Sequence, residues 1–348
     1  MAATKKLSNE KPAPVSPFYQ IIFILISAAT IGACLCYNLG KFHMIDDQPN
    51  IQTITPAKFK EFGGFPSFIT TGFHINKFEI FDVIKNQFLV DGIIWFKYIS
   101  GSVSLKTLEL FSFNRGEIIK KSPAEVQIEG EYIVVRYNIK VKFSSNINYK
   151  YFPVDSHRIY LCLTHEFMGP KEVQFLASAQ LFTIEPTALE SGWKIIDKHT
   201  VTGYDQAQFN ESAELNQQEK LYPITILSFD IKRSGMRHLI TILLPLLIIF
   251  YISFFGLSVI SGSLKIGITA ITAIITYRFV IENMSPNAPY FMISDYIFFL
   301  FLFAELFVFL LIIIKLYSNV LQTPVAKILI ASIHMTVVAV SSYILLAV

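Results

Sequence analysis

Polar side chains recur at helical spacing inside one apolar segment in the last third of the chain. The segment reads SGSLKIGITAITAIITYRFVIENM and covers residues 261–284. The residues that could meet water or ions there are Ser261, Lys265, Thr269, Thr272 and Thr276. At about 100° of rotation per residue, all of them fall within a sector of about 80°. The spacing therefore predicts an amphipathic membrane helix with one narrow polar stripe.

Several interpretations of this stripe remain open from spacing alone. Serine and threonine often lie at helix–helix contacts in membranes, so the stripe could be a packing seam, or it could arise by chance. It could also face a column of water, which would require several copies of the chain around one axis. A lysine near the end of a span can extend to the membrane interface, so Lys265 alone does not decide between these interpretations.

The composition favours a membrane protein and offers no sign of catalysis. Of 348 residues, 53% are hydrophobic and 16% are charged, whereas soluble proteins have about 25% charged residues. A net charge of +3 without a basic run gives no reason to expect a nucleic-acid partner. The three cysteines form neither a disulfide framework nor a metal motif. We therefore expect no enzyme, no cofactor and no metal site.

The apolar segments divide the chain into regions. One lies at 18–40, and four follow in quick succession at about 238–260, 264–284, 291–316 and 325–347, each near the ~20 residues that span a bilayer. The expected domains are a cytoplasmic N-terminal segment (1–17), a signal peptide or transmembrane anchor (18–40), an extracytoplasmic β-sandwich (41–233) and a four-helix transmembrane pore domain (234–348).

The region between these apolar segments has the alternating pattern of β-strands. The stretch GFHINKFEIFDVIKNQFLVDGIIWFKY alternates on both sides of a turn at Lys85-Asn86, and EVQIEGEYIVVRYNIKVKF is broken in the same way at Glu129-Gly130. Further short strands are expected in HRIYLCL, QLFTIE, GWKIIDKHTV and PITILSFDIKR. Many short strands with turns between them are typical of a β-sandwich.

Charged residues suggest how the chain crosses the membrane. Basic residues precede the first apolar segment, as they do in a signal peptide or in an anchor whose N-terminus stays inside. Either alternative sends the β domain outside. The expected inner loops then hold Lys265, Lys315 and Lys327, and the outer loop holds Glu282 and Asp295. We expect a multi-pass protein of a bacterial inner membrane.

Five separate motifs resemble the pentameric ligand-gated ion channels, the Cys-loop receptor superfamily, and above all its bacterial members. These are FLVDGIIWFKY (88–98), YFPVDSHRIYLCL (151–163), FDIKRSGMRHLITILLPLLIIFYISF (229–254), KIGITAITAIIT (265–276) and ENMSPNAPYFMISDYIFF (282–299). They occur in the order that the family has, over about residues 50–348. The resemblance implies a homopentamer, in which each chain has four identical partners in the lipid bilayer.

The family resemblance also implies roles for individual residues. The second helix of each copy would line the pore for permeant ions with Ser261, Lys265, Thr269, Thr272 and Thr276, and Phe279 is a candidate outer constriction. A small-molecule or proton agonist would bind the β domain, where the candidates are Tyr132, Trp193, Tyr204 and Phe209. Gating would pass through Pro153, Asp155, Arg233, Pro245, Pro286, Pro289 and Asp295. We expect Asp155 and Arg233 to form an ion pair. Arg278 and Glu282 are four residues apart and could pair within their helix or bridge two subunits, and we expect the pair within the helix.

The sequence also departs from the family pattern. Ser145 and Ile159 stand where animal receptors have the two cysteines of the loop disulfide, and Thr272 stands where an apolar gate is usual. No acidic ring precedes Lys265, so five lysines at the inner mouth would favour anions. The alternative function is a non-conducting, membrane-anchored receptor that uses the β domain alone.

Overall fold

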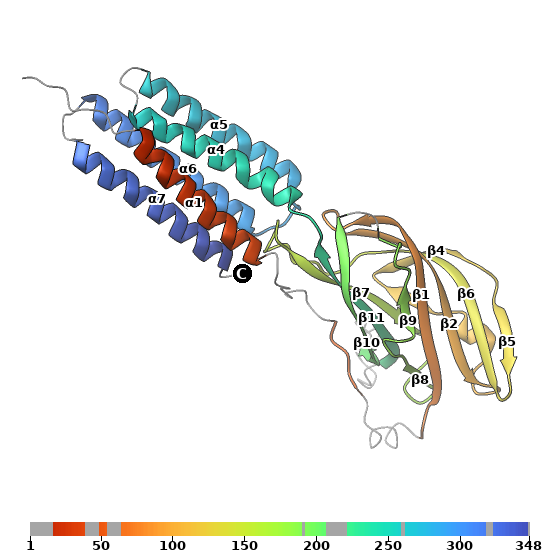
Figure 1. Ribbon diagram of the computed structural model, residues 1–348. Helices are drawn as coiled ribbons and strands as arrows, with labels where there is room; N and C mark the ends of the chain where they lie inside the picture. The colour runs from red at the N-terminus through yellow and green to blue at the C-terminus, as the bar shows by residue number, and fades with distance from the viewer. Residues whose placement is uncertain are drawn as a thin grey trace, which may run out of the picture. The chain divides into compact units, whose positions relative to one another are not determined.

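The computed structural model describes residues 17–38, 49–53, 64–189, 192–206, 221–258, 262–317 and 323–346. These residues form two compact units. The β unit contains the strands, and the helix unit contains the long helices together with a short loop, residues 149–155. Figure 1 shows both units.

The described strands of the β unit form two sheets. One sheet has the order β4-β6-β2-β1-β8, with β5 added to β6 and β9 added to β1; the other has the order β10-β11-β7-β3. The strands of the first sheet are β1 (Ser67–Asp82), β2 (Gln87–Ile99), β4 (Gly116–Lys121), β5 (Glu125–Glu129), β6 (Tyr132–Phe143), β8 (Val173–Leu176) and β9 (Phe182–Ile184). The second sheet contains β3 (Ser112–Asn114), β7 (Ser156–Thr164), β10 (Trp193–Gln206) and β11 (Leu221–Arg233), and a short helix, α3 (Leu105–Leu108), precedes β3.

Alternation of side chains and two turns explain how the sheets form. Residues of β2 are buried at every second position, as expected for a strand with one face on a core. The two sheets meet through apolar residues such as Phe78 and Phe229, whose ring centroids lie 5.6 Å apart. The predicted turns are confirmed: Asn86 and Gly130 have positive φ angles of 53° and 63°, which turn residues tolerate. Strands β3, β4 and β8 were not predicted.

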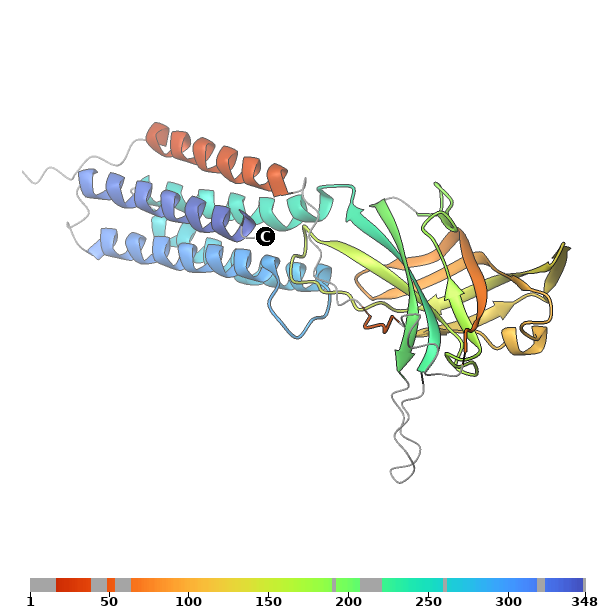
Figure 2. The same ribbon diagram turned by 90° about the horizontal axis from the view of Figure 1, so that it is seen from below.

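Four helices in the described part of the chain are long and apolar enough to span a membrane, as predicted. They are α4 (Arg237–Ser258), α5 (Ser263–Met284), α6 (Ile293–Tyr317) and α7 (Thr323–Leu346). A further helix, α1 (Pro17–Asn38), packs along α7 and α4 in the same unit (Figure 2). A β-sheet unit followed by four long apolar helices agrees with the expected architecture at this coarse level.

Helix α5 lies close to α6 because a glycine removes a side chain at their contact. A Cβ atom built on Gly267 would lie 2.7 Å from Cδ2 of Phe309, which is closer than real Cβ atoms approach. The small residue therefore lets α5 pack flat on its neighbour, as small residues do at membrane helix contacts. This contact fixes which side of α5 is buried.

Candidate functional site

The polar stripe of α5 lies on the side of the helix opposite its buried contacts with the other described helices. Its described members are all exposed: Lys265, Thr269, Thr272 and Thr276, together with Phe279. The buried residues of α5 are Ser263, Gly267, Ala270, Ile274 and Ile281. With about 100° per residue, the buried side lies about 140–180° from Lys265. The stripe is therefore no packing seam within its own chain. Ser261 lies outside the described residues.

The threonines and the lysine of the stripe differ in how their polar atoms are satisfied. Oγ1 of Thr272 donates to the carbonyl of Ile268 at 2.9 Å, and Oγ1 of Thr276 donates to the carbonyl of Thr272 at 2.8 Å. Such bonds within one helix need no outside partner. Lys265 makes no hydrogen bond or ion pair with any of the described residues. An ammonium group in that position requires water or a second chain.

A shallow groove of about 560 Å³ borders the stripe on the side toward α4. It is lined by Ile249, Ile268, Thr269, Thr272, Ala273, Thr276, Tyr277 and Val280. Ile249 comes from α4, and the other lining residues come from α5. The groove thus offers four apolar side chains together with the hydroxyl groups of three threonines and Tyr277, which is suitable for contact with another helix.

Helix α5 is tied to α4 at the point where a proline interrupts the hydrogen bonds of α4. Pro245 has no N–H, so the carbonyl of Thr241, four residues earlier, lacks its usual helical donor. The hydroxyl of Tyr277 on α5 donates a hydrogen bond to this carbonyl. Helix α4 continues unbroken through Pro245 because a neighbouring helix satisfies the free carbonyl, as is common in membranes.

A second tie joins α5 to the start of α6. Arg278 donates from Nη1 to Oδ1 of Asp295 at 2.5 Å, and the Asp295 side chain is 5% exposed. The other carboxylate oxygen of Asp295 accepts the backbone N–H of Met292 at 2.8 Å. A carboxylate in the first turn of a helix also interacts favourably with the helix dipole. We expected Arg278 to pair with Glu282 in its own helix, but the partner that the structure shows is Asp295.

The loop 149–155 supplies hydrogen-bond acceptors to the N-terminus of α6. The first N–H groups of a helix have no partner within the helix. In α6, the N–H of Ile293 donates to the carbonyl of Lys150 at 3.0 Å, and that of Ser294 donates to the carbonyl of Phe152 at 3.1 Å. The N–H of Tyr149 donates to the hydroxyl of Tyr290 at 2.9 Å. The loop therefore belongs with the helices and caps α6.

Within the β unit, Ser145 holds the base of this loop by hydrogen bonds. Its backbone N–H donates to Oδ1 of Asn86 at 2.9 Å, and its carbonyl accepts from Nδ2 of the same side chain at 2.7 Å. Its hydroxyl accepts the N–H of Tyr160 at 3.2 Å. All three cysteines are free, and the hydrogen bond between Ser145 and Tyr160 connects the segments on either side of the loop.

The residues proposed for coupling lie in loop 149–155, between α5 and α6, and at the end of β11. Pro153 is buried in loop 149–155, and Asp155 at the end of the loop is 2% exposed. Between α5 and α6, Pro286 is buried and Pro289 is exposed. In the β unit, the guanidinium of Arg233 lies 4.5 Å from the ring centroid of Trp193. Asp155 and Arg233 belong to different units, so the expected ion pair between them stays a prediction.

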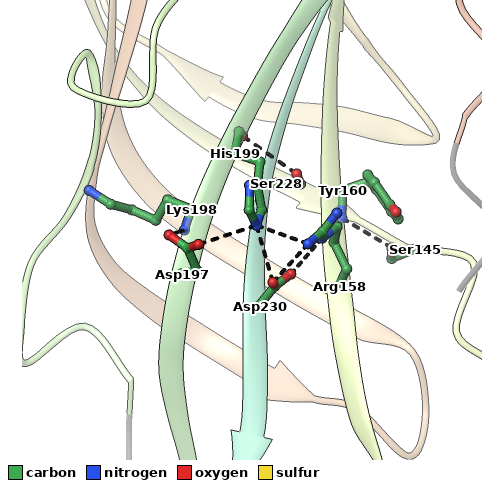
Figure 3. Close-up of polar contacts among 8 residues, drawn as sticks. All are labelled: Ser145, Arg158, Tyr160, Asp197, Lys198, His199, Ser228 and Asp230. Carbon is green, nitrogen blue, oxygen red and sulfur yellow. Dashed lines mark hydrogen bonds and ion pairs between the residues drawn. The ribbon is translucent and has the colours of Figure 1, made fainter. Parts of the chain in front are cut away.

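A second polar cluster, which the sequence analysis missed, ties three strands of the smaller sheet together (Figure 3). Arg158 on β7 donates from Nε and Nη2 to the two carboxylate oxygens of Asp230 on β11, at 2.5 and 2.8 Å. Nε2 of His199 on β10 lies 2.9 Å from Nη2 of Arg158. Nε2 of the same ring also lies 3.2 Å from Oδ2 of Asp230. The hydrogen bond to Asp230 also raises the pKa of Arg158.

The proposed agonist residues do not gather at one place. Trp193 and Tyr204 stand eleven residues apart on β10, which is about 36 Å in a strand. Tyr204 is fully buried and its hydroxyl donates to the carbonyl of Val173 at 2.9 Å. We therefore correct its assignment: it is a core residue. Tyr132 is exposed, with Nζ of Lys97 5.1 Å from its ring centroid. Phe209 lies outside the described residues.

The missed residues carry only weak signals in the sequence. Pro245 predicts a free carbonyl at Thr241, and a search for donors on the neighbouring helix would have found Tyr277 among several candidates. Arg158 lies three residues after Asp155 in the quoted loop motif, but nothing local identifies Asp230 as its partner. The described residues contain no group of three or more metal-binding side chains.

Comparisons with known proteins do not assign a family. No model of a known protein family matches the chain, and a search of curated proteins gives no significant match.

Proposed function

We propose that the chain is one subunit of a homo-oligomeric, ligand-gated ion channel whose pore is lined by α5. The observation that carries this proposal is the direction of the polar stripe, which lies opposite the side of α5 that is buried against the other described helices and includes Lys265. Hydrocarbon does not tolerate an unpaired ammonium group. Several copies around an axis would turn their stripes toward one column of water. The resemblance stated above gives five copies, with agonist binding to the β unit.

The side chains of the stripe suggest an anion-preferring pore. Five Lys265 side chains at the inner mouth would raise the local concentration of anions and repel cations. The hydroxyls of Thr269, Thr272 and Thr276 would line the middle with polar atoms, and those of Thr272 and Thr276 are bonded to the backbone of their own helix. Phe279 is 65% exposed near the outer end of the stripe, so a ring of five phenyl groups there is our candidate for the apolar constriction.

The contacts of the helix unit suggest how gating would reach this pore. Loop 149–155 caps α6, the first turn of α6 holds Asp295, and Asp295 holds Arg278 on α5. A movement of the loop would therefore act on α5 through two hydrogen-bonded steps. Tyr277, the residue next to Arg278, connects the same part of α5 to α4. We propose Tyr277 and Arg278 as the residues that transmit a loop movement to the pore helix.

The test is a conductance measurement on purified protein in planar bilayers under a chloride gradient, with a screen over pH and small amines and carboxylates. We expect a reversal potential that moves toward the chloride equilibrium potential. Lys265→Glu should reverse or strongly reduce the preference for anions, while Lys265→Gln serves as the neutral control. A reversal potential that follows sodium would contradict anion preference.

The oligomeric state separates the channel from the non-conducting receptor. Mass measurement of the detergent-solubilised protein should give five copies. A monomer, or an intact oligomer that conducts under no condition of the screen, would favour the receptor that uses the β unit alone.

A further inference from the structure

The N-terminal helix α1 buries one narrow side against the other helices. We call this side the α1 seam: Gln20, Ser27, Ile31 and Cys34. Gln20, Ser27 and Ile31 are 0%, 4% and 1% exposed, and their spacing of seven and four residues places them on one face of a helix. The opposite face carries Phe18, Leu25 and Ile26, which are all more than half exposed. Helix α1 thus has a protein side and a lipid side.

The contacts of the seam fix the direction of α1. Tyr19 donates from its hydroxyl to the carbonyl of Lys327 at 3.3 Å, near the start of α7. The ring of Phe23 lies 5.9 Å from that of His334, and Sγ of Cys34 lies 3.4 Å from Oγ of Ser342, near the end of α7. The residue numbers of the contacting pairs increase in the same direction along both helices, so α1 runs parallel to α7 (Figures 1 and 2).

Polar groups of three helices meet under α1. Oγ of Ser27 and the hydroxyl of Tyr251 on α4 lie 2.9 Å apart. The side chain of His334 on α7 is buried between aromatic rings of α1 and α4. The ring centroids of His334 and Phe254 lie 4.4 Å apart. Without α1, the Tyr251 hydroxyl would lose this partner, and His334 would lose the cover of Phe23. A polar group left without a partner in hydrocarbon is costly.

These features differ from those of a leader peptide. The apolar core of a leader has about 7–15 residues and is removed after export, whereas α1 has 22 residues, which is enough to span a bilayer. A segment that is cleaved off cannot stabilise the mature chain, so the hydrogen bond between Ser27 and Tyr251 favours a helix that is retained. Interhelical hydrogen bonds and small residues are the features that join permanent membrane helices.

We infer that α1 is a permanent fifth membrane helix of the mature subunit, parallel to α7 and bound by its seam to α7 and α4. This inference concerns the make-up of the subunit and does not depend on whether the pore conducts.

Two measurements test the inference. The first is the intact mass of the unaltered chain, expressed in a bacterium with an active signal peptidase and purified from its membrane. We expect the full 39.5 kDa. A mature protein that lacks the residues through α1 would overturn the inference, whatever the behaviour of any variant.

The second measurement tests the placement of α1 by a disulfide between native Cys34 and Ser342→Cys. A protease site inserted after residue 40 would release α1 unless it is crosslinked. After oxidation with iodine and cleavage, we expect an N-terminal tag to stay with the large fragment on a non-reducing gel, and to leave it on reduction. The matched control is Cys34→Ser/Ser342→Cys, which keeps Cys36, an exposed residue two positions further along the helix.

The outcomes of the second measurement are distinct. A crosslink yield several times that of the control supports the placement of the seam. A yield equal to that of the control, in protein of normal gel-filtration profile, would overturn it. If Ser342→Cys does not fold, the pair Ser27→Cys/Tyr251→Cys, in a chain with Cys34→Ser and Cys36→Ser, reports the contact with α4 through a bifunctional thiol reagent, because the Tyr251 ring that spans this contact is too long for a direct disulfide.

Discussion

Helices α1 and α5 both carry polar residues at regular spacing in an apolar segment, yet they present them in opposite directions. The α1 seam faces its own bundle, and its buried residues are Gln20, Ser27 and Ile31. The polar stripe of α5 faces outward, and its described members are all exposed. Periodicity in a membrane helix therefore identifies a polar side but not the surface that covers it.

The chemistry of the two sets of side chains agrees with their directions. A hydroxyl or an amide can be satisfied inside a protein by one partner, as Ser27 is by Tyr251. An ammonium group is strongly hydrated and carries a full charge, so it is expensive to bury without a counter-ion. Lys265 has no counter-ion among the described residues. The Ser27–Tyr251 pair of the seam is thus satisfied within the chain, whereas Lys265 of the stripe has no such partner among the described residues.

The largest stability effect should come from the ion pair that ties α5 to α6, in which the side chain of Asp295 is 5% exposed and that of Arg278 is 29% exposed. Asp295→Ala leaves Arg278 without this partner, and because the pair is only partly buried we expect a cost at the lower end of the range for buried pairs, about 3 kcal/mol. The measurement is equilibrium unfolding in mixed detergent micelles. The matched control is Lys265→Ala, which also removes one charge in this helix pair but from the exposed side. Equal losses of stability for the two variants would contradict the distinction between the two sides of α5.

The next largest effect should distinguish the buried polar side of α1 from the exposed polar side of α5. Ser27→Leu introduces a large side chain into the packed seam and removes the bond to Tyr251, which should cost about 1–3 kcal/mol. Thr272→Leu makes a comparable polar-to-apolar change on the exposed stripe, and its stability should stay within about 0.5 kcal/mol of the parent chain. The same unfolding assay compares them. A destabilised Thr272→Leu with an unaffected Ser27→Leu would reverse our assignment.

A smaller effect is expected at the tie between α5 and α4. Tyr277→Phe keeps the ring but removes the donor for the carbonyl of Thr241 beside Pro245. Such bonds between membrane helices contribute about 0.6–2 kcal/mol. Tyr343→Phe is the control, because Tyr343 is 73% exposed on α7. If both variants unfold like the parent, the hydroxyl of Tyr277 does not stabilise the pair of helices.

The β unit offers a weaker, pH-dependent case of a buried polar group. His165 is fully buried, Nε2 donates to the carbonyl of Thr107 at 2.7 Å, and Nδ1 has no partner among the described residues. Burial lowers the pKa of His165 below its ordinary value. Below pH about 6.5 the unfolded chain binds a proton that the folded chain resists, so stability should fall as the pH falls.

The measurement of this effect is the melting temperature of the full chain between pH 8 and pH 5. His165→Gln keeps an N–H donor but cannot titrate, so it should show a flatter loss of stability toward low pH. An identical pH profile for parent and variant would show that His165 does not contribute.

The sequence predicts most of the elements and few of their contacts. The four spans, the strand pairs around Asn86 and Gly130, and the angular position of the stripe follow from periodicity and turn chemistry, which are local. The partner of Arg278 was expected within its own helix, but the structure shows Asp295, which lies on the next helix. The seven-residue spacing in α1 is visible in the sequence, yet only tertiary packing shows that a tyrosine of α4 meets it. The burial of Tyr204 likewise depends on strands far apart in the chain.

The most direct test of the central claim is the accessibility of the stripe to water. In a chain without native cysteines, a single cysteine replaces Thr272 on the stripe or Leu310 on the exposed side of α6. Each membrane-embedded protein is treated with a charged, impermeant methanethiosulfonate and, separately, with a permeant maleimide. We expect the cysteine at position 272 to react with both reagents and the one at 310 to react only with the maleimide. If position 272 also excludes the charged reagent under every condition that opens the protein, α5 does not line a water-filled pore.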